Sequence, residues 1–209
     1  MQDSIHVYET HHQASVAAAE AVAAEMRRLI AERGRAIGIF SGETSQAELL
    51  THLANADGIE WTRVIGFHTF ELLGVEEDAP NSQRKFLLDH LVCRVPMAEF
   101  HGLRGEAANP EAVCANYAEL LNTRPPDFAV LTIGQNGELA AIDSANCDFH
   151  DSSAVKLTTS AITLTIPALM ACRSLFVLGV PAFTEGEISE RHPASILRTH
   201  PNANFYGVL

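Results

Sequence analysis

The chain has 209 residues, a length at which an α/β layered structure can close around one core. Hydrophobic residues make up 47% and charged residues 19%, with no low-complexity tract, which excludes global disorder. Lys and Arg number 14 against 26 Asp and Glu, and the net charge of -12 would repel nucleic-acid phosphates and anionic membranes. We therefore expect no nucleic-acid or membrane partner, and we predict a single domain over residues 1–209.

The sequence also indicates where the protein is located in the cell and whether its cysteines are reduced. The first residues lack the basic and apolar parts of a signal peptide, and no segment offers 18 uninterrupted apolar residues, so we expect a cytoplasmic protein. The cysteines are widely spaced and form no CxxC pair, which favours reduced, mostly buried thiols. They are Cys93, Cys114, Cys147 and Cys172.

The histidines give no metal-binding pattern. His11 and His12 are adjacent at a probable helix start, and the others are scattered. We therefore expect no metal and no cofactor.

The first two thirds of the chain alternate strands and helices. Residues 13–33 carry apolar side chains at helical spacing and end at Gly34, which predicts a helix. Residues 35–40 predict a strand that leads through a tight loop into a helix within 41–55. The same patterns predict strands at 61–67 and 126–134 and helices at 82–92 and 110–122.

The last third is rich in short β-type segments. They lie at 154–159, 161–166, 174–180 and 203–209, with a brief apolar turn at 167–172. The whole order predicts an α/β fold with a doubly wound, mostly parallel sheet and helices on both faces, a Rossmann-like single domain. Ligands of such sheets collect beyond the carboxyl ends of the strands, where the loops after Phe40, Phe67 and Ile133 would converge.

The loop after the first of these strands reads "SGETS". Ser41 follows the strand, Gly42 allows a close turn, and Thr44 and Ser45 place hydroxyls at the start of the next helix. This composition suits an anion cradle, and it equally suits an N-capped helix after a turn. Glu43 adds an anion, either as a partner of the helix dipole or as a group that excludes a ligand.

The loop after the second strand contains His68 and Glu71 among apolar neighbours. A histidine and a carboxylate at a strand end could act as base and orienter. The alternative is an ordinary polar loop with a histidine at the strand end.

The third loop, "TIGQNGELAAIDSAN", has two glycines, Gly134 and Gly137, around Asn136, and then Glu138 and Asp143. Two carboxylates in a closed site can divide acid and base roles if their surroundings separate their pKa values. The alternative is a glycine-rich turn with solvated acids.

Taken in order, these segments resemble the glucosamine-6-phosphate deaminase and 6-phosphogluconolactonase superfamily, with the deaminase branch nearer. That family typically reads TGSTP, FNLDEYxG, SYxxFM, GxGxDGHxAFNEP and PASxLQxHPN. The corresponding residues here are 41–45 "SGETS", 67–74 "FHTFELLG", 82–87 "SQRKFL", 132–144 "TIGQNGELAAIDS" and 193–202 "PASILRTHPN". The resemblance covers nearly the whole chain and implies a cleft around Gly134, Asn136 and Gly137, with residues 41–45 as the phosphate loop.

The catalytic positions implied by the resemblance are substituted. The family's Asp that moves the sugar's C2 proton corresponds to Phe70, which cannot take a proton, and Glu71 lies beside it. The Asp and His of the third loop correspond to Asn136 and Glu138, and the Glu that supports the His corresponds to Asp143. Glu138 could act as a base if its pKa is raised.

Two further features differ from the family pattern. Almost nothing separates 154–159 from 161–166, where the family usually inserts an arginine-bearing lid. The basic residue that the family places after its "VLG" strand has no counterpart in "VLGVPAFTEGE". A missing lid admits water and weakens electrostatic catalysis.

Three functions remain open from the sequence. The preferred one is a divergent relative that binds a sugar phosphate with weak, altered or absent deaminase activity. The alternative is an active amino-sugar-6-phosphate isomerase or deaminase that uses Glu138 or His68 as a surrogate base, and a lactonase fits less well. A homo-oligomer is possible, because the family includes several oligomeric states.

Overall fold

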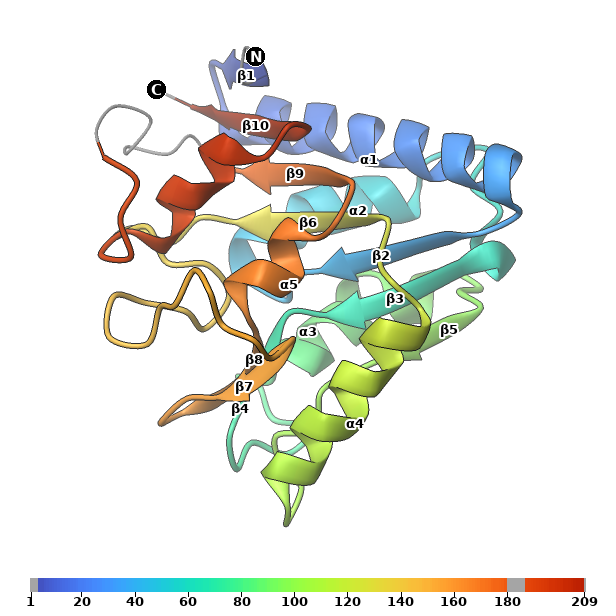
Figure 1. The fold of residues 1–209 in the computed structure, drawn as a ribbon. Coiled ribbons are helices and arrows are strands. Elements are labelled where there is room, and N and C mark those ends of the chain that lie inside the picture. Colours follow the sequence, from blue (N-terminus) through green and yellow to red (C-terminus); the bar gives the residue numbers. More distant parts are fainter. Residues whose placement is uncertain (1–3, 180–186, 209) are drawn as a thin grey trace.

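A computed structural model of the chain describes residues 4–179 and 187–208, and its centre is a seven-stranded parallel sheet (Figure 1). The strand order is β1-β10-β9-β6-β2-β3-β5. These strands are β1 (Ser4–Tyr8), β2 (Ala36–Phe40), β3 (Val64–His68), β5 (Glu99–His101), β6 (Phe128–Thr132), β9 (Ser174–Leu178) and β10 (Ala203–Val208). A smaller antiparallel sheet has the order β4-β8-β7, with β4 (Phe70–Leu72), β7 (Val155–Leu157) and β8 (Ala161–Leu164).

The helices cover both faces of the large sheet. The α-helices are α1 (His11–Arg33), α2 (Ala47–Ala54), α3 (Gln83–His90), α4 (Pro110–Thr123) and α5 (Ile166–Met170). The 3-10 helices are η1 (Thr44–Gln46), η2 (Trp61–Arg63), η3 (Val92–Arg94) and η4 (Pro193–Thr199). α1, α2 and α3 pack on one face, and α4, α5, η4 and the small sheet pack on the other. The predicted doubly wound α/β fold is therefore confirmed.

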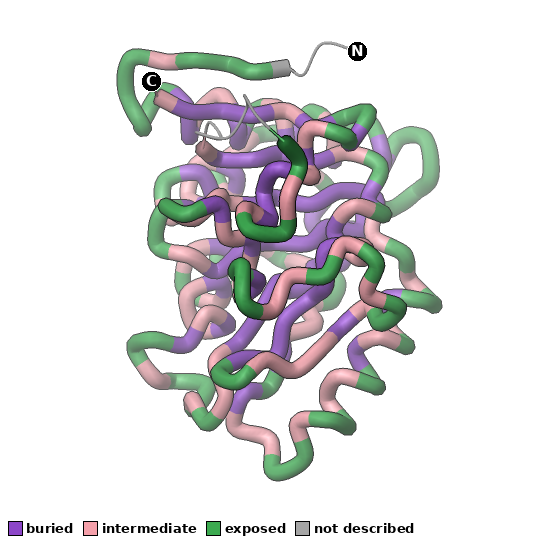
Figure 2. The backbone as a smooth tube through the Cα atoms, turned by 60° about the vertical axis from the view of Figure 1, so that its left-hand side comes forward, coloured by how far each residue is buried: buried purple, intermediate pink, exposed green. Residues whose placement is uncertain are grey.

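Two hydrophobic cores follow from the alternation of side chains along the parallel strands. In β2, Ile37 and Ile39 belong to the core under α4 and α5, whereas Ala36 and Phe40 belong to the core under α1 and α2. β2 and β3 are buried over their whole length, while the edge strand β1 is mostly exposed (Figure 2).

Helix α1 illustrates how local sequence sets the element boundaries. Thr10 caps its first turn by accepting a hydrogen bond from the Gln13 N–H at 3.2 Å. Gly34 ends it in the left-handed conformation with φ 76, which glycine adopts without steric cost. The helix spans the sheet from the carboxyl ends of the strands to their amino ends (Figure 1).

The connections reverse direction between β2 and β6, which are neighbours in the sheet. From β2 the chain builds β3 and β5 on one side, and from β6 it continues to β9 and β10 on the other. Such a switch point leaves a crevice beyond the carboxyl ends of the two strands, because their following loops diverge. The loops that begin at Ser41 and Ile133 flank this crevice.

Several local predictions were wrong or incomplete. β1, β4 and β5 were missed. β4 and β5 have only three residues each, whereas the alternation of polar and apolar residues in Ser4–Tyr8 was overlooked. Residues 166–170 form the short helix α5 rather than an apolar turn, capped by Thr165, which accepts a hydrogen bond from the Ala168 N–H. Cys93 is exposed, not buried, and all four cysteines are free thiols. Val180 and Leu209, at the ends of two predicted strands, lie outside the described residues.

The described residues were searched for membrane-spanning helices and for groups of metal-binding side chains. Within residues 4–179 and 187–208, no helix is both long and apolar enough to cross a membrane. In the same part of the chain, no three His, Cys, Asp or Glu side chains are grouped so that they could hold a metal ion. The single-domain organisation remains a prediction.

Candidate functional site

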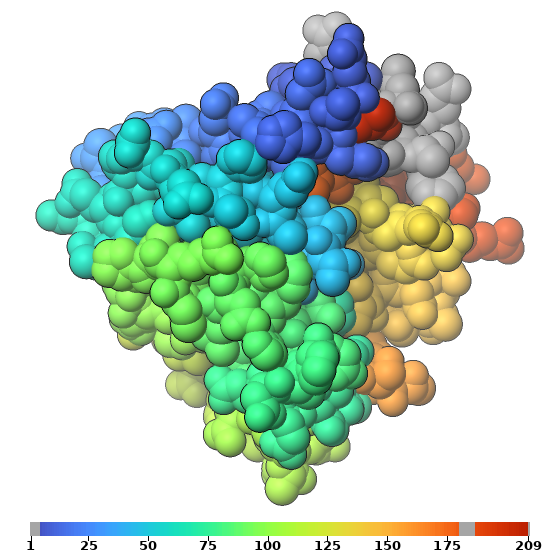
Figure 3. Space-filling model, turned by 180° about the vertical axis from the view of Figure 1, so that it is seen from behind, coloured from blue at the N-terminus to red at the C-terminus, as the bar shows by residue number. Residues whose placement is uncertain are grey.

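A cleft of about 420 Å³ lies at the carboxyl edge of the large sheet, at the switch point. It is lined by His11, Ser15, Thr44, Ser45, Ala47, Glu48, Thr132, Ile133, Leu178 and Gly179. The segment after β2 and the segment after β6 meet there and lie side by side on the surface (Figure 3). Its volume is in the range of small-molecule sites.

The loop after β2 supplies one wall of the cleft. The Ser41 N–H continues the pairing with β6 by donating to the Val130 carbonyl at 3.1 Å. Gly42 lies against α3, and a Cβ at this position would overlap the Gln83 carbonyl. Thr44 and Ser45 begin η1 and are exposed at the cleft. Glycine is therefore required at position 42 because the backbone there packs closely against the start of α3.

Polar contacts join this loop to the end of β6. The Gln46 side-chain amide donates to the Thr132 hydroxyl at 2.8 Å, and Ser45 Oγ lies 3.4 Å from the same oxygen. Gln46 is buried, and its Oε1 has no hydrogen-bond partner within the described residues. These contacts fix the width of the cleft between η1 and β6.

Glu43 is partly buried in the same loop and accepts a hydrogen bond from Ser41 Oγ at 2.8 Å. Burial raises the pKa of the Glu43 carboxyl, the Ser41 hydrogen bond opposes the rise, and the charge of Glu138 adds to it. Glu43 is the residue before η1 but makes no side-chain capping hydrogen bond. Its carboxylate thus lies in the loop after β2 without serving as a helix cap.

His68, at the end of β3, is fully buried. Neither of its ring nitrogens has a hydrogen-bond partner within the described residues. Burial, together with the smaller effect of the nearby Arg84 charge, lowers the pKa of His68 to about 3. The ring is therefore neutral at pH 7 and lies beneath the surface rather than in the cleft lining.

Glu71 in β4 is also fully buried and binds the start of α3. Its carboxylate accepts hydrogen bonds from the Ser82 hydroxyl at 2.8 Å, from the Gln83 N–H at 3.1 Å and from the Arg84 N–H at 2.8 Å. A fourth comes from the Leu72 N–H at 2.8 Å. This arrangement satisfies the free amides of a helix N-terminus, so the geometry gives Glu71 a structural role.

Phe70 lies beside it in β4, opposite Thr163 of β8. The ring is 8% exposed and offers no group that could accept a proton. The preceding residue, Thr69, is buried, and its hydroxyl has no partner within the described residues.

The loop after β6 is organised by its own glycines and by Glu138. Gly137 adopts φ 83, and a Cβ on Gly134 would overlap the Glu138 carboxylate. The two Glu138 oxygens accept hydrogen bonds from the Asn136 N–H and from the Asn136 side-chain amide, both at 2.9 Å. The Asn136 side-chain hydrogen bond is the main cause that lowers the pKa of Glu138, which makes its carboxylate a weaker base.

Asp143 lies further along the loop and is exposed. Its carboxylate accepts hydrogen bonds from the Ala145 N–H at 2.9 Å and the Asn146 N–H at 3.2 Å, which is an Asx-type turn. No hydrogen bond or ion pair joins it to Glu138 within the described residues.

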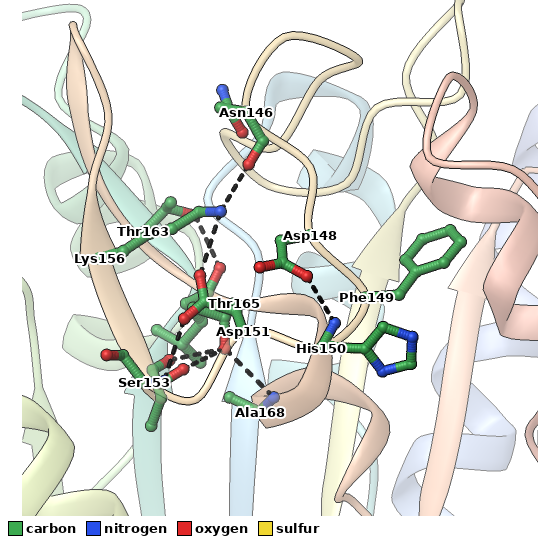
Figure 4. A network of polar contacts seen from close by, with 12 residues as sticks. Asn146, Asp148, Phe149, His150, Asp151, Ser153, Lys156, Thr163, Thr165 and Ala168 are labelled. Atoms are coloured by element: carbon green, nitrogen blue, oxygen red, sulfur yellow. Dashed lines mark hydrogen bonds and ion pairs between the residues drawn. The ribbon is translucent and has the colours of Figure 1, made fainter.

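The segment that follows is held by a polar network (Figure 4). Lys156 of β7 donates to the Asn146 carbonyl at 2.5 Å and lies 3.3 Å from an Asp151 oxygen. Thr165 donates to the Ser153 carbonyl at 2.7 Å. β7 and β8 join directly through the turn at Thr158, so the small sheet is closed by a tight hairpin.

The η4 segment contacts the same loop, a feature that the loop motif alone did not reveal. The Ala194 N–H donates to the Gly137 carbonyl at 2.8 Å, and His192 Nδ1 lies 3.3 Å from the Asn136 carbonyl. The family-like wording of residues 193–202 was the only sequence signal for this contact.

Thr44 and Ser45 line the cleft, whereas the other expected cleft and loop residues are not among its lining residues: Ser41, Gly42, Glu43, Gly134, Asn136, Gly137 and Glu138. Several lining residues were not singled out in the sequence. His11 and Ser15 come from the first turns of α1, and Glu48 comes from α2. The helix pattern does not distinguish a cleft-facing polar residue from a solvated one, so these residues carried no recognisable signal.

A parallel α/β sheet with a small-molecule cleft at its switch point defines the class of Rossmann-like ligand-binding proteins. Comparison of the sequence with models of protein families identifies the family within this class. The model described as glucosamine-6-phosphate isomerases/6-phosphogluconolactonase matches residues 9–182. The chain belongs to this family.

Individual relatives come from both branches of the family. Glucosamine-6-phosphate deaminases of Lactococcus lactis and Streptococcus sanguinis are 24% and 27% identical, each over 85% of this chain and 86% of the relative. The structure of a monomeric glucosamine-6-phosphate deaminase has a TM-score of 0.85 at 20% identity, covering 98% of this chain and 97% of that one. A 6-phosphogluconolactonase from Shewanella baltica also gives 0.85 at 20% identity, over 100% and 98%. The fold does not separate the two branches.

Proposed function

We propose that this chain binds a phosphorylated sugar in the carboxyl-edge cleft and has weak or absent deaminase activity. Its relatives include glucosamine-6-phosphate deaminases, the cleft is lined by Thr44 and Ser45, and the loops that bear the lining residues keep Gly42, Gly134 and Gly137. The observation that carries the proposal is the state of Glu138, whose two oxygens are both bound by Asn136. A carboxylate held this way is a poor proton acceptor for a sugar carbon.

The alternative is an active isomerase or deaminase with Glu138 or His68 as the surrogate base. A general base works best when its pKa lies near the working pH, and the pKa values of both groups are lowered. His68 is in addition fully buried. A lactonase would need Glu138 in the same role, so the same observations weigh against it.

One observation supports a second candidate, acid–base chemistry through Glu43. Among the Asp and Glu residues that the structure describes, Glu43 is the one whose pKa is raised, and it lies in the loop that bears Thr44 and Ser45. A raised pKa brings a carboxyl closer to neutral pH and suits a proton donor. The effect of Glu43→Gln on turnover separates this candidate from the first.

The binding proposal is tested by calorimetric titration with glucosamine 6-phosphate, using glucosamine as the ligand without phosphate. Ala47→Leu places a larger side chain in the cleft, and Ala115→Leu makes the same change on the exposed face of α4. We expect saturable binding of the phosphate ester only, with one binding site fewer in Ala47→Leu than in Ala115→Leu. Equal binding by both variants would refute this site.

A further inference from the structure

A second cavity lies at the opposite edge of the large sheet, where the strands begin. Its volume is about 450 Å³, and it is lined by Arg33, Arg35, Ile37, Pro125, Pro126, Asp127, Ala171 and Arg173. The lining comes from the end of α1, the start of β2, the segment before β6 and the segment before β9. α1 connects the two sites, because His11 and Ser15 near its start line the carboxyl-edge cleft and Arg33 at its end lines this cavity.

The charge of this lining contrasts with the charge of the whole chain. Three of the 14 Lys and Arg residues line one cavity of a protein whose net charge is -12. Asp127 is the single carboxylate in the lining, so three guanidinium groups face one negative charge. The lining therefore carries a net charge of about +2 at neutral pH, since guanidinium groups stay protonated.

Asp127 shows that this cavity is built rather than incidental. It is buried, and its carboxylate accepts from Arg33 Nη1 at 2.7 Å and from the Ile37 N–H at 3.1 Å. Its carbonyl accepts from the Arg173 N–H at 2.8 Å. One residue thus ties together the end of α1, the start of β2 and the start of β9, which fixes the backbones that carry the arginines.

The three arginines differ in the hydrogen bonds and ion pairs that their guanidinium groups already make. Arg33 has Asp127 as its partner, senses the charge of Glu25, and lies in the last turn of α1, where a cation also favours the helix dipole. The guanidinium groups of Arg35 and Arg173 have no hydrogen bond or ion pair within the described residues. Both residues are exposed at the cavity, so two guanidinium groups are available to a ligand.

We propose that this cavity is a second ligand site, distinct from the carboxyl-edge cleft, for a small metabolite carrying a phosphate monoester. A phosphate monoester has a charge of about -1.5 to -2 at neutral pH, which matches the net charge of the lining. Its oxygens accept the paired N–H groups of Arg35 and Arg173. The cavity exceeds the size of a phosphate group, and Ile37, Pro125 and Pro126 provide an apolar wall for the rest of the molecule.

The test is calorimetric titration with glucose 6-phosphate, in a protein whose carboxyl-edge cleft is filled by Ala47→Leu. In that background, Arg35→Gln/Arg173→Gln removes the two unpaired guanidinium groups. Arg94→Gln/Arg104→Gln removes the same charge from exposed positions that do not line the cavity. Glucose is the uncharged control ligand. A separate Arg173→Gln variant covers the case in which the double change lowers the melting temperature.

We expect glucose 6-phosphate to bind the Arg94→Gln/Arg104→Gln protein and to lose at least tenfold in affinity in Arg35→Gln/Arg173→Gln, with partial loss in Arg173→Gln. Glucose should not bind. Equal affinities of the two double variants, or no binding to the Ala47→Leu background, would overturn the second site. Neither result bears on the carboxyl-edge cleft, which is tested by the number of glucosamine 6-phosphate sites in Ala47→Leu against Ala115→Leu.

Discussion

The segment after β3 and the segment after β6 both carry family-motif polar residues, but their surroundings differ. After β3, His68, Thr69 and Glu71 are fully buried. After β6, Asn136 and Asp143 are exposed, and the hydrogen bonds of their side chains stay within the loop. A buried polar group is costly unless it is satisfied, whereas an exposed one exchanges protein contacts for water at little cost. The first segment should therefore govern stability, and the second should govern what the cleft binds.

The largest effect is expected at Glu71. Glu71→Ala removes the acceptor of four hydrogen bonds and leaves the amides at the start of α3 buried without a partner. The free energy of unfolding should fall by about 3 kcal/mol or more. Chemical denaturation measures this change. Glu76→Ala, at an exposed position nearby, should shift it by less than about 0.5 kcal/mol. A Glu71→Ala protein as stable as Glu76→Ala would contradict the structural role.

The next effect is a pH dependence of stability that originates in His68. The pKa of His68 is about 3 in the folded protein, below that of an exposed histidine at about 6.5. Below pH 6.5 the unfolded chain therefore binds a proton that the folded chain does not, so stability falls as pH decreases toward 3. The loss between pH 7 and pH 5 should be about 2 kcal/mol.

His68→Leu removes the titrating group and should remove this part of the pH dependence. His150→Leu, at an exposed position, is the matched control and should keep it. Denaturation curves at pH 5 and pH 7 for the three proteins give the comparison. An unchanged pH dependence in His68→Leu would show that the ring is not buried in neutral form.

A smaller effect on ligand affinity is expected at Glu43. Glu43→Gln removes an anion from the loop that bears Thr44 and Ser45, and it relieves repulsion with Glu138. Affinity for glucosamine 6-phosphate should rise by roughly fivefold, because the phosphate no longer meets a carboxylate. Titration calorimetry measures it, with the exposed Glu60→Gln as control. A fall in ammonia release without a gain in affinity would instead support Glu43 as an acid–base group.

The smallest effect is expected at Glu138. Glu138→Gln keeps the size of the side chain and loses one charge-assisted hydrogen bond to Asn136, so stability should change by less than about 1 kcal/mol. Any residual ammonia release should stay within about twofold of the unchanged protein. A loss of more than a hundredfold would assign the surrogate base to Glu138.

The fold was largely predictable because its signals are local and periodic. The apolar spacing of α1 and the buried runs of β2, β3, β6 and β9 can be read from neighbouring residues alone. Strands β4 and β5 escaped because each has three residues and is defined by its partner in the sheet. Their existence depends on long-range pairing, which no local pattern contains.

For the candidate site, the sequence predicted the position of the loops but not the orientation of their side chains. The glycines and hydroxyls of 41–45 and 132–138 indicated where a cleft would lie, and Thr44 and Ser45 line it. The orientation of each carboxylate was not accessible. Glu71 turns toward α3 and Glu138 toward Asn136 because of contacts that form only in the folded chain. The spacing of carboxylates in the sequence alone cannot distinguish a residue that caps a helix from one that acts as a general base.

The central claim is that ligand binding persists while proton transfer at the sugar is lost. It is tested most directly by proton NMR of glucosamine 6-phosphate in D₂O, with protein at stoichiometric concentration. Saturation transfer reports binding, and loss of the C2 proton signal reports exchange with solvent. We predict saturation transfer to the sugar with no measurable C2 deuteration over hours. C2 deuteration accompanied by ammonia release at about 1 per second or faster, the range of ordinary enzymes, would contradict the account.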